Sequence, residues 1–263
     1  MHITITGNLG SGKSTVAKLL SEKYNFEVYS TGKVQRELAE QMNLSTLELN
    51  QLMMSDRKYD HMIDDATARI SKDNKDKDII FDSRLAWNFV EHSFKVFVSV
   101  RLDEAAGRVM NDQRGSVEKY SSIEEAKELL TKRAETESIR YKDIYNLNYM
   151  DFSNYNLIID STYCTPDIIA DIIIEEAKVY YNNPRLATKR LVSPKSLKFK
   201  DFNEEQDKDR LKDLIDKLDS TIYARDHIIK VSKEDKEFLV LENADYAKAA
   251  FLAGVSYIEI ELD

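Results

Sequence analysis

The N-terminal segment constrains the fold most, because it places a glycine-rich loop between a predicted strand and a helix. After the strand His2–Thr6 the chain runs Gly7-Asn8-Leu9-Gly10-Ser11-Gly12-Lys13-Ser14, which fits the pattern G-x-x-x-x-G-K-[ST] at every position. Glycines let such a loop wrap so that backbone N–H groups point at phosphate oxygens, and the following helix directs its positive dipole end at the same anion. A glycine-rich turn without a ligand is the alternative. The motif predicts a nucleotide-phosphate site, but alone it does not separate kinases from other NTPases.

This loop provides the groups predicted to bind a phosphate donor. We expect Lys13 to reach the β- and γ-phosphates and act in catalysis, and the Ser14 hydroxyl to ligate Mg²⁺. The predicted cofactors are therefore ATP and Mg²⁺. The residues expected to bind them are Gly7, Asn8, Gly10, Ser11, Gly12, Lys13, Ser14 and Thr15.

Short β-prone runs alternate with helical segments through the first 180 residues. The predicted strands are His2–Thr6, Phe26–Ser30, Asp78–Asp82, Lys95–Arg101 and Tyr155–Asp160, and the longer helices are Asp103–Met110, Ile123–Tyr145 and Ile168–Tyr181. Such alternation implies a parallel sheet covered on both faces. We predict an α/β fold, with a P-loop NTPase-type five-stranded parallel sheet flanked by helices in residues 1–183 and a smaller α+β domain in residues 184–263.

The boundary rests on a break at Asn182-Asn183-Pro184 and on a basic stretch, Arg185–Lys200, whose six charged side chains are all positive. A solvated linker is favoured there over contact with nucleic acid. The predicted elements beyond it are a strand at Arg190–Leu197, a helix at Asp207–Leu218, strands near His227–Val231 and Glu237–Leu241, a helix at Ala244–Ala253 and a strand at Tyr257–Leu262.

The composition limits the cellular compartment and the partners that we expect for this chain. The 47 acidic and 38 basic residues give a net charge of −9, which argues against a protein that coats nucleic acid. A single cysteine, Cys164, excludes an internal disulfide and favours a reducing compartment. No apolar run approaches the roughly 20 residues that span a membrane, and the strand at His2 leaves no room for a signal peptide. We expect a cytoplasmic protein without membrane contact; the sequence indicates no oligomeric state.

Polar groups follow the third predicted strand. The apolar run 79–81 ends at Asp82, and an acid at such a strand end assists the Mg²⁺ shell in P-loop folds. Capping of the next turn is the alternative. Arg84 lies just beyond the carboxyl end of the strand, where ligands bind in open α/β sheets, and its guanidinium could hold a phosphate bidentately. Surface solvation is the other interpretation of Arg84.

Four arginines follow the fourth strand: Arg108, Arg114, Arg133 and Arg140. Phosphoryl transfer needs positive charge that closes over the γ-phosphate, and a helical flap that carries arginines can supply it. We predict catalytic roles for Arg108, Arg133 and Arg140. The alternative is pairing on a helix surface, because Glu135 and Glu137 are near in sequence.

At this point the chain resembles the cytidylate kinase family, over roughly residues 1–180. The blocks that carry the resemblance occur in order along the chain and are 29–37 (YSTGKVQRE), 59–64 (YDHMID), 81–87 (FDSRLAW), 133–145 (RAETESIRYKDIY) and 151–160 (DFSNYNLIID). The resemblance implies a nucleoside monophosphate as phosphate acceptor, CMP or dCMP first. The residues that it implies for the acceptor are Ser30, Gly32, Arg36, Asp64, Asp82 and Arg84. Ser83 departs from the family's glycine before the arginine, and Asn88 and Phe89 depart from smaller, more polar residues.

The predicted function is ATP- and Mg²⁺-dependent phosphorylation of a nucleoside monophosphate. An acceptor phosphate is already ionised near neutral pH and needs no general base, which fits the scattered histidines. One alternative is a P-loop kinase for another small acceptor; a hydroxyl acceptor would need Asp64 or Asp82 as base. Another is a nucleotide-binding regulatory module that signals through its C-terminal domain.

The C-terminal region resembles the ParB/sulfiredoxin family in three blocks, 190–197, 237–250 and 254–260. The turn at 242–246 has neither the glycine nor the arginine of that family's phosphate-binding turn, and its two acids would repel a phosphate. We therefore expect nucleotide chemistry to be lost here. Stability, sensing or binding of a protein partner remain as its roles.

Overall fold

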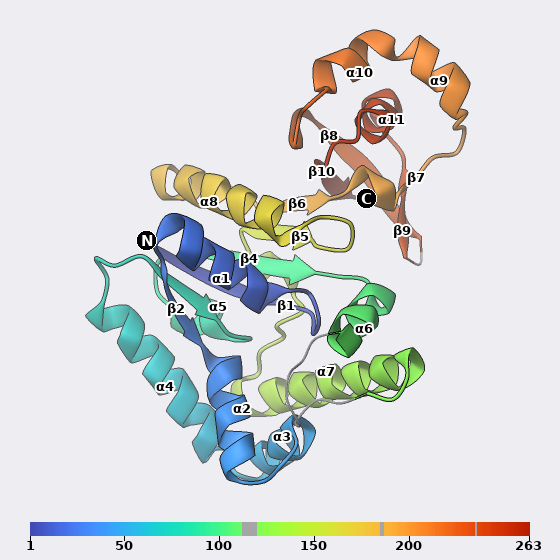
Figure 1. The fold of residues 1–263 in the computed structure, drawn as a ribbon. Helices are drawn as coiled ribbons and strands as arrows, with labels where there is room; N and C mark the ends of the chain where they lie inside the picture. The colour runs from blue at the N-terminus through green and yellow to red at the C-terminus, as the bar shows by residue number, and fades with distance from the viewer. Residues whose placement is uncertain (112–119, 185–186, 235) are drawn as a thin grey trace.

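A computed structural model describes residues 1–111, 120–184, 187–234 and 236–263. Its described strands form one sheet of ten strands in the order β2-β3-β1-β4-β5-β6-β10-β8-β9-β7 (Figure 1). The strands are β1 (His2–Gly7), β2 (Glu27–Ser30), β3 (Ile79–Asp82), β4 (Ser93–Ser99), β5 (Leu157–Asp160), β6 (Lys189–Val192), β7 (Leu197–Lys198), β8 (Tyr223–Glu234), β9 (Glu237–Val240) and β10 (Tyr257–Leu262).

The five strands predicted for the N-terminal region are confirmed as one parallel block, β2-β3-β1-β4-β5. β1 lies in the centre, where His2 pairs with Ile79 of β3 and with Ser93 of β4. Every residue of β1 and β3 is buried, as expected for parallel strands covered on both faces. The parallel arrangement brings the carboxyl ends of these strands to one edge of the sheet.

Helices connect the strands and cover both faces. Their bounds are α1 (Lys13–Tyr24), α2 (Thr31–Gln41), α3 (Thr46–Ser55), α4 (Lys58–Asp73), α5 (Ala86–Phe89), α6 (Leu102–Asn111), α7 (Ile123–Tyr145), α8 (Pro166–Asn182), α9 (Glu204–Arg210), α10 (Lys212–Leu218) and α11 (Ala244–Leu252), with 3₁₀ turns η1 (Phe152–Asn154) and η2 (Pro194–Ser196). The predicted helix Ile123–Tyr145 is confirmed. None of the helices in the described part of the chain is long and apolar enough to cross a membrane.

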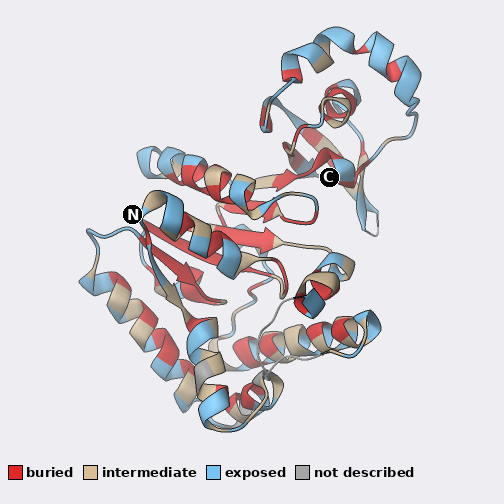
Figure 2. Cartoon of the chain, viewed as in Figure 1, coloured by how far each residue is buried: buried red, intermediate tan, exposed pale blue. Residues whose placement is uncertain are grey.

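Two apolar layers enclose the parallel strands. On one face α1 and α8 lie side by side and bury Val16, Leu20 and Ile173 against the sheet. On the other face an aromatic layer that includes Trp87 and Tyr141 packs against β4 and β5. The buried residues form stripes on helices whose outer faces are exposed (Figure 2). These layers bury the parallel strands on both faces.

The C-terminal region continues the same sheet. β6 pairs in parallel with β5 and in antiparallel orientation with β10, so the hydrogen-bonded ladder crosses the predicted boundary. The predicted strand Arg190–Leu197 is wrong as one element: it is β6, the turn η2 and β7, because Pro194 cannot donate a ladder hydrogen bond. The predicted helix Asp207–Leu218 is divided at Leu211 into α9 and α10. A separate core under α10 and α11 supports this part of the sheet.

Candidate active site

The loop between β1 and α1 has a shape that only glycine allows at two positions. A Cβ atom at Gly7 would lie 2.0 Å from the carbonyl oxygen of Val98. Gly10 has a φ of +74°, and a Cβ there would lie 2.9 Å from Ala105 of α6. The N–H of Asn8 donates to the Val98 carbonyl at 3.1 Å, which fastens the loop to β4. The loop is thus held close to both the sheet and α6.

Lys13 is the first residue of α1 and turns back over the loop. Its ammonium donates to the carbonyl oxygens of Asn8 (2.6 Å) and Gly7 (3.2 Å) and to Ser11 Oγ (3.4 Å). The ammonium is therefore held where the loop's N–H groups and the N-terminus of α1 would meet a phosphate.

The two predicted metal ligands are in direct contact. Ser14 Oγ donates to Asp82 Oδ2 at 2.8 Å, and Ser30 Oγ donates to the same oxygen at 3.2 Å. Ser30 also caps α2, since its hydroxyl accepts a hydrogen bond from the Lys33 N–H. A hydroxyl and a carboxylate oxygen are hard ligands of the kind that Mg²⁺ takes beside nucleotide phosphates. The pair therefore fits a magnesium ion.

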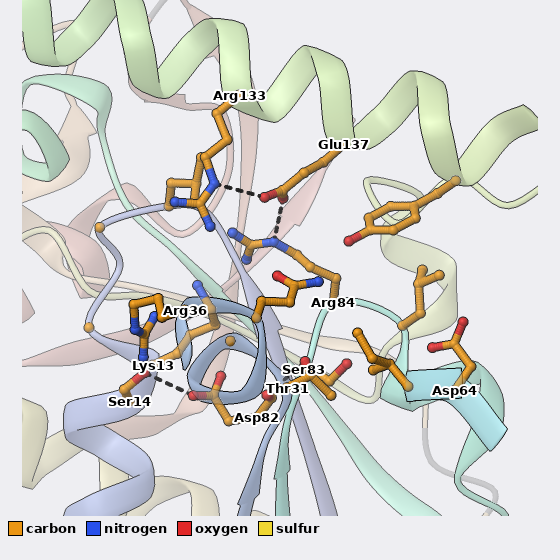
Figure 3. A pocket seen from close by; sticks show the side chains of 18 of the residues that line it. Lys13, Ser14, Thr31, Arg36, Asp64, Asp82, Ser83, Arg84, Arg133 and Glu137 are labelled. Carbon is orange, nitrogen blue, oxygen red and sulfur yellow. Dashed lines mark hydrogen bonds and ion pairs between the residues drawn. The ribbon is translucent and has the colours of Figure 1, made fainter. Parts of the chain in front are cut away.

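A cavity of about 650 Å³ opens over the carboxyl ends of β1, β2 and β3 (Figure 3). Its walls come from the loop, α2, α4, the segment after β3 and α7. The predicted site residues that line it are Gly10, Gly12, Lys13, Ser14, Thr15, Gly32, Arg36, Asp64, Asp82, Arg84 and Arg133. One cavity thus contains both the donor-side and the acceptor-side residues.

Other predicted residues do not line this cavity. Gly7, Asn8, Ser11 and Ser30 support the loop and α2 from behind, as the contacts above show. Arg108 faces away, donating to the carbonyl oxygen of Ser161 at 2.6 Å. Arg140 is buried, with a side chain only 1% exposed, and contacts Asn50 and Asp60. The catalytic roles of Arg108 and Arg140 stay predictions, and Arg114 lies outside the described residues.

Glu137 of α7 joins two of the arginines in the cavity. Its Oε2 accepts from Arg84 Nε at 2.7 Å and its Oε1 from Arg133 Nε at 3.0 Å (Figure 3). Arg84 also donates to the carbonyl oxygen of Gly7. Burial alone would raise the pKa of Glu137, but the two guanidinium groups outweigh it and hold the pKa at about 2. An ionised carboxylate therefore links α7 to the phosphate loop through Arg84.

Two carboxylates of α4 form the far wall of the cavity. Asp64 accepts a hydrogen bond from the Tyr145 hydroxyl; burial and the nearby Asp60 outweigh this bond and raise the pKa of Asp64 to about 6. Burial also raises the pKa of Asp60, against the opposing charge of Arg140. Asp60 is 4% exposed, and within the described part of the chain its Oδ2 has no hydrogen-bond partner. This wall is therefore acidic, and one of its carboxylate oxygens has no hydrogen-bond donor among the described residues.

Glu137 and Asp60 lie in blocks that resemble the family but were not among the predicted site residues. The spacing of Arg133 and Glu137 signalled an ion pair, but a pair four residues apart is usual on a helix surface. Asp60 belonged to a block quoted for the family resemblance. Asp60 lies four residues before Asp64, and this spacing puts both carboxylates on one face of α4. The spacing is the signal that could have placed Asp60 in the site.

The fold and the site together define a class of protein. A phosphate loop after the central strand, a Ser–Asp pair and arginines that share one cavity are features of P-loop phosphotransferases that act on small molecules. Residues 2–163 match the cytidylate kinase-like family, and the chain belongs to that family.

Individual relatives agree with this assignment. The chain is 35% identical over 179 residues to a cytidylate kinase of Methanobrevibacter smithii, a match that spans 68% of this chain and 99% of that protein. It is 34% identical over 182 residues to a cytidylate kinase of Natronomonas pharaonis, spanning 68% and 91%. An uncharacterized protein from Eubacterium ventriosum shares the fold, with a TM-score of 0.52 and 18% identity over 68% of this chain and 98% of that one. The family match stops at residue 163, so it gives the resemblance to the ParB/sulfiredoxin family no support.

Proposed function

We propose that this chain transfers the γ-phosphoryl group of ATP to a nucleoside monophosphate, with CMP or dCMP as the preferred acceptor. The observation that carries the proposal is the single cavity in which Lys13 and the Ser14–Asp82 pair face Arg36 and Asp64. Membership of the cytidylate kinase-like family supports the same reaction. The names of the relatives favour cytidylate as the acceptor.

Each group in the cavity has a part in this reaction. Lys13 and the loop N–H groups bind the donor phosphates, while Ser14 and Asp82 hold Mg²⁺. When bound there, Mg²⁺ would neutralise charge on the donor phosphates. Arg84 and Arg133 place positive charge near the transferred group, where charge stabilisation lowers the barrier most. The acceptor is a phosphate oxygen, so no side chain has to remove a proton.

The unsatisfied oxygen of Asp60 favours cytosine over uracil. Asp60 lines the cavity, and its Oδ2 is buried without a hydrogen-bond donor among the described residues; a ligand N–H that displaces the groups covering this oxygen would supply one. The exocyclic amine of cytosine is such a donor, whereas uracil has a carbonyl oxygen at that place. Asp64 lies one helical turn away and lines the same wall.

Asp64 also favours a second candidate function, a kinase for a small molecule with a hydroxyl acceptor. Its pKa of about 6 suits a general base near neutral pH. Asp82 is less available for this role, because Ser14 and Ser30 both donate to it. A regulatory module that binds nucleotide without turnover is a third candidate, in which the C-terminal region would contact a protein partner. For all three candidates we infer a cytoplasmic protein, as the single cysteine favours.

A coupled ADP-release assay with MgATP and a panel of nucleoside monophosphates tests the proposal. We expect turnover with CMP or dCMP that Lys13→Ala abolishes. Lys23→Ala is the matched control, because Lys23 lies on the same helix but pairs with Asp171 outside the cavity. ATP binding without turnover on any monophosphate would reject the proposal, and turnover on a hydroxyl acceptor would favour the second candidate.

A further inference from the structure

One contact between the C-terminal region and the kinase fold lies beside the carboxyl ends of β4 and β5, whereas others lie along β5 and on α8. The C-terminal region lies beyond the matched part of the chain, since two thirds of this chain cover nearly all of the Methanobrevibacter relative. Its first strand, β6, extends the parallel sheet at β5. The contacts made next to this junction show which part of the site the region can influence.

A buried tyrosine of β10 holds the segment that follows β5. The Tyr257 hydroxyl donates to the carbonyl oxygen of Asp160 at 2.7 Å, and its side chain is fully buried. Four residues further along this segment, Cys164 Sγ donates to the carbonyl oxygen of Ser256 at 3.3 Å. The segment 160–164 is therefore fastened to β10 at both of its ends.

The same segment is fastened to α6 on its other side. Arg108 donates to the Ser161 carbonyl oxygen at 2.6 Å and to Ser161 Oγ at 3.1 Å. α6 in turn contacts the phosphate loop, because Ala105 lies against Gly10. A second contact from the C-terminal region reaches α6 directly: Lys236 pairs with Asp103 at 2.6 Å, close to where the β8–β9 hairpin approaches this helix (Figure 1). This exposed pair alone contributes little.

The in-line geometry of phosphoryl transfer decides which substrate lies beside α6 and the segment 160–164. The acceptor-side residues Gly32, Arg36 and Asp64 lie over β2 and β3, on one side of the loop. The attacking oxygen and the leaving ADP must lie on opposite sides of the transferred phosphoryl group. The rest of the donor therefore extends over the ends of β4 and β5, toward α6 and the segment 160–164.

We propose that the C-terminal region positions the segment 160–164 beside the donor, and that Tyr257 is its principal positioning residue. The proposal rests on the use of ATP as the donor at the phosphate loop. Loss of the Tyr257 hydroxyl leaves the Asp160 carbonyl oxygen without this donor and loosens the segment on the side of β10, while its contacts with Arg108 and Ser99 remain. Affinity for MgATP then falls, while affinity for the acceptor is retained.

The test compares Tyr257→Phe with Tyr223→Phe in the full-length chain. Tyr223 pairs with Tyr257 in the sheet and is also buried, but its hydroxyl donates to Glu259 and not to the segment. Calorimetry gives the Kd of MgATP, and steady-state kinetics give the KM of ATP and of CMP. We expect Tyr257→Phe to raise the Kd and KM for ATP about three- to tenfold, the range for one buried hydrogen bond. The KM for CMP, and all values for Tyr223→Phe, should stay within about twofold.

An unchanged Kd for MgATP in Tyr257→Phe overturns the proposal, as does an equal rise in Tyr223→Phe or an equal rise in the KM for CMP. If Tyr257→Phe does not fold, Cys164→Ala removes the other contact of the segment, and an unchanged Kd there has the same meaning. Because the Kd needs no acceptor, this test stands even if no monophosphate is phosphorylated. Absence of turnover on every monophosphate would reject the proposed function but not the role of Tyr257.

Discussion

Replacing Glu137 with glutamine tests how the two arginines of the cavity are held. The change preserves the shape of the side chain but removes the charge. The single amide oxygen can still accept from either Arg84 or Arg133. The amide N–H₂ then faces the other guanidinium, and both of these groups are donors only. One arginine therefore loses its carboxylate partner and shifts from its present direction.

The expected magnitude follows from burial. Removing one partner of a buried ion pair costs about 3–5 kcal/mol, and the value should lie near the lower end because the arginine side chains keep 14% exposure. Displacing a site group by about 1 Å costs roughly 10²-fold in rate. We expect kcat/KM to fall about 10²-fold, which corresponds to about 2.7 kcal/mol of lost transition-state stabilisation.

Steady-state kinetics of Glu137→Gln and Glu135→Gln measure this effect. Glu135 is exposed on the same helix, so its variant should keep wild-type kinetics. The charge itself can be tested by pH. The pKa of Glu137 is lowered from 4.5 to about 2, so its ion pairs stabilise the fold above pH 4.5 and are lost as pH falls toward 2.

The stability difference between wild type and Glu137→Gln should therefore be largest near neutral pH and shrink by about 3 kcal/mol as pH falls from 5 to 2. Denaturant unfolding at several pH values measures it. Wild-type kcat/KM in Glu137→Gln, or a stability difference that does not depend on pH, would refute the reasoning.

Three further substitutions test other parts of the site. Gly10→Ala forces a Cβ against Ala105 at a φ of +74° and should weaken MgATP binding at least about tenfold by calorimetry, whereas a Cβ in Gly107→Ala meets no atom within 4 Å and should leave binding unchanged. The pKa of Asp64 is raised from 3.8 to about 6, so its ionisation costs stability as pH rises through that range. The midpoint denaturant concentration of Asp64→Asn should exceed that of wild type at pH 7.5 but not at pH 3.5. Equal midpoints at both pH values would contradict the pKa shift. Asp60→Asn replaces an acceptor by a group that can also donate, so the ratio of kcat/KM for CMP over UMP should fall about tenfold or more, and an unchanged ratio would separate Asp60 from base recognition.

Local patterns predicted the parallel block and the phosphate loop well. Strand ends at Ser30 and Asp82 and the whole of α7 follow from periodicity and from turn residues next to them in the chain. The Ser14–Asp82 contact was also predictable, because the carboxyl ends of neighbouring parallel strands meet at one edge.

Burial and partner choice could not be predicted in the same way. Arg133, Glu137 and Arg140 have similar sequence surroundings, yet the first two face the cavity and Arg140 is buried against Asn50, 90 residues away. That contact depends on how α3 packs against α7. The continuation of the sheet through β6 into β10 was likewise missed, since a strand pattern does not name its neighbour.

The central claim is that this cavity transfers phosphate to a cytidine monophosphate. Its most direct measurement is identification of the products formed from an equal mixture of CMP, UMP, AMP and GMP with limiting MgATP and full-length protein. We predict CDP as the main diphosphate formed from the four acceptors, in an amount equal to the ATP consumed and to the ADP released, with none formed by Lys13→Ala. UDP or GDP in excess over CDP, more ADP released than ATP consumed, or no phosphorylated acceptor while MgATP still binds would contradict the account.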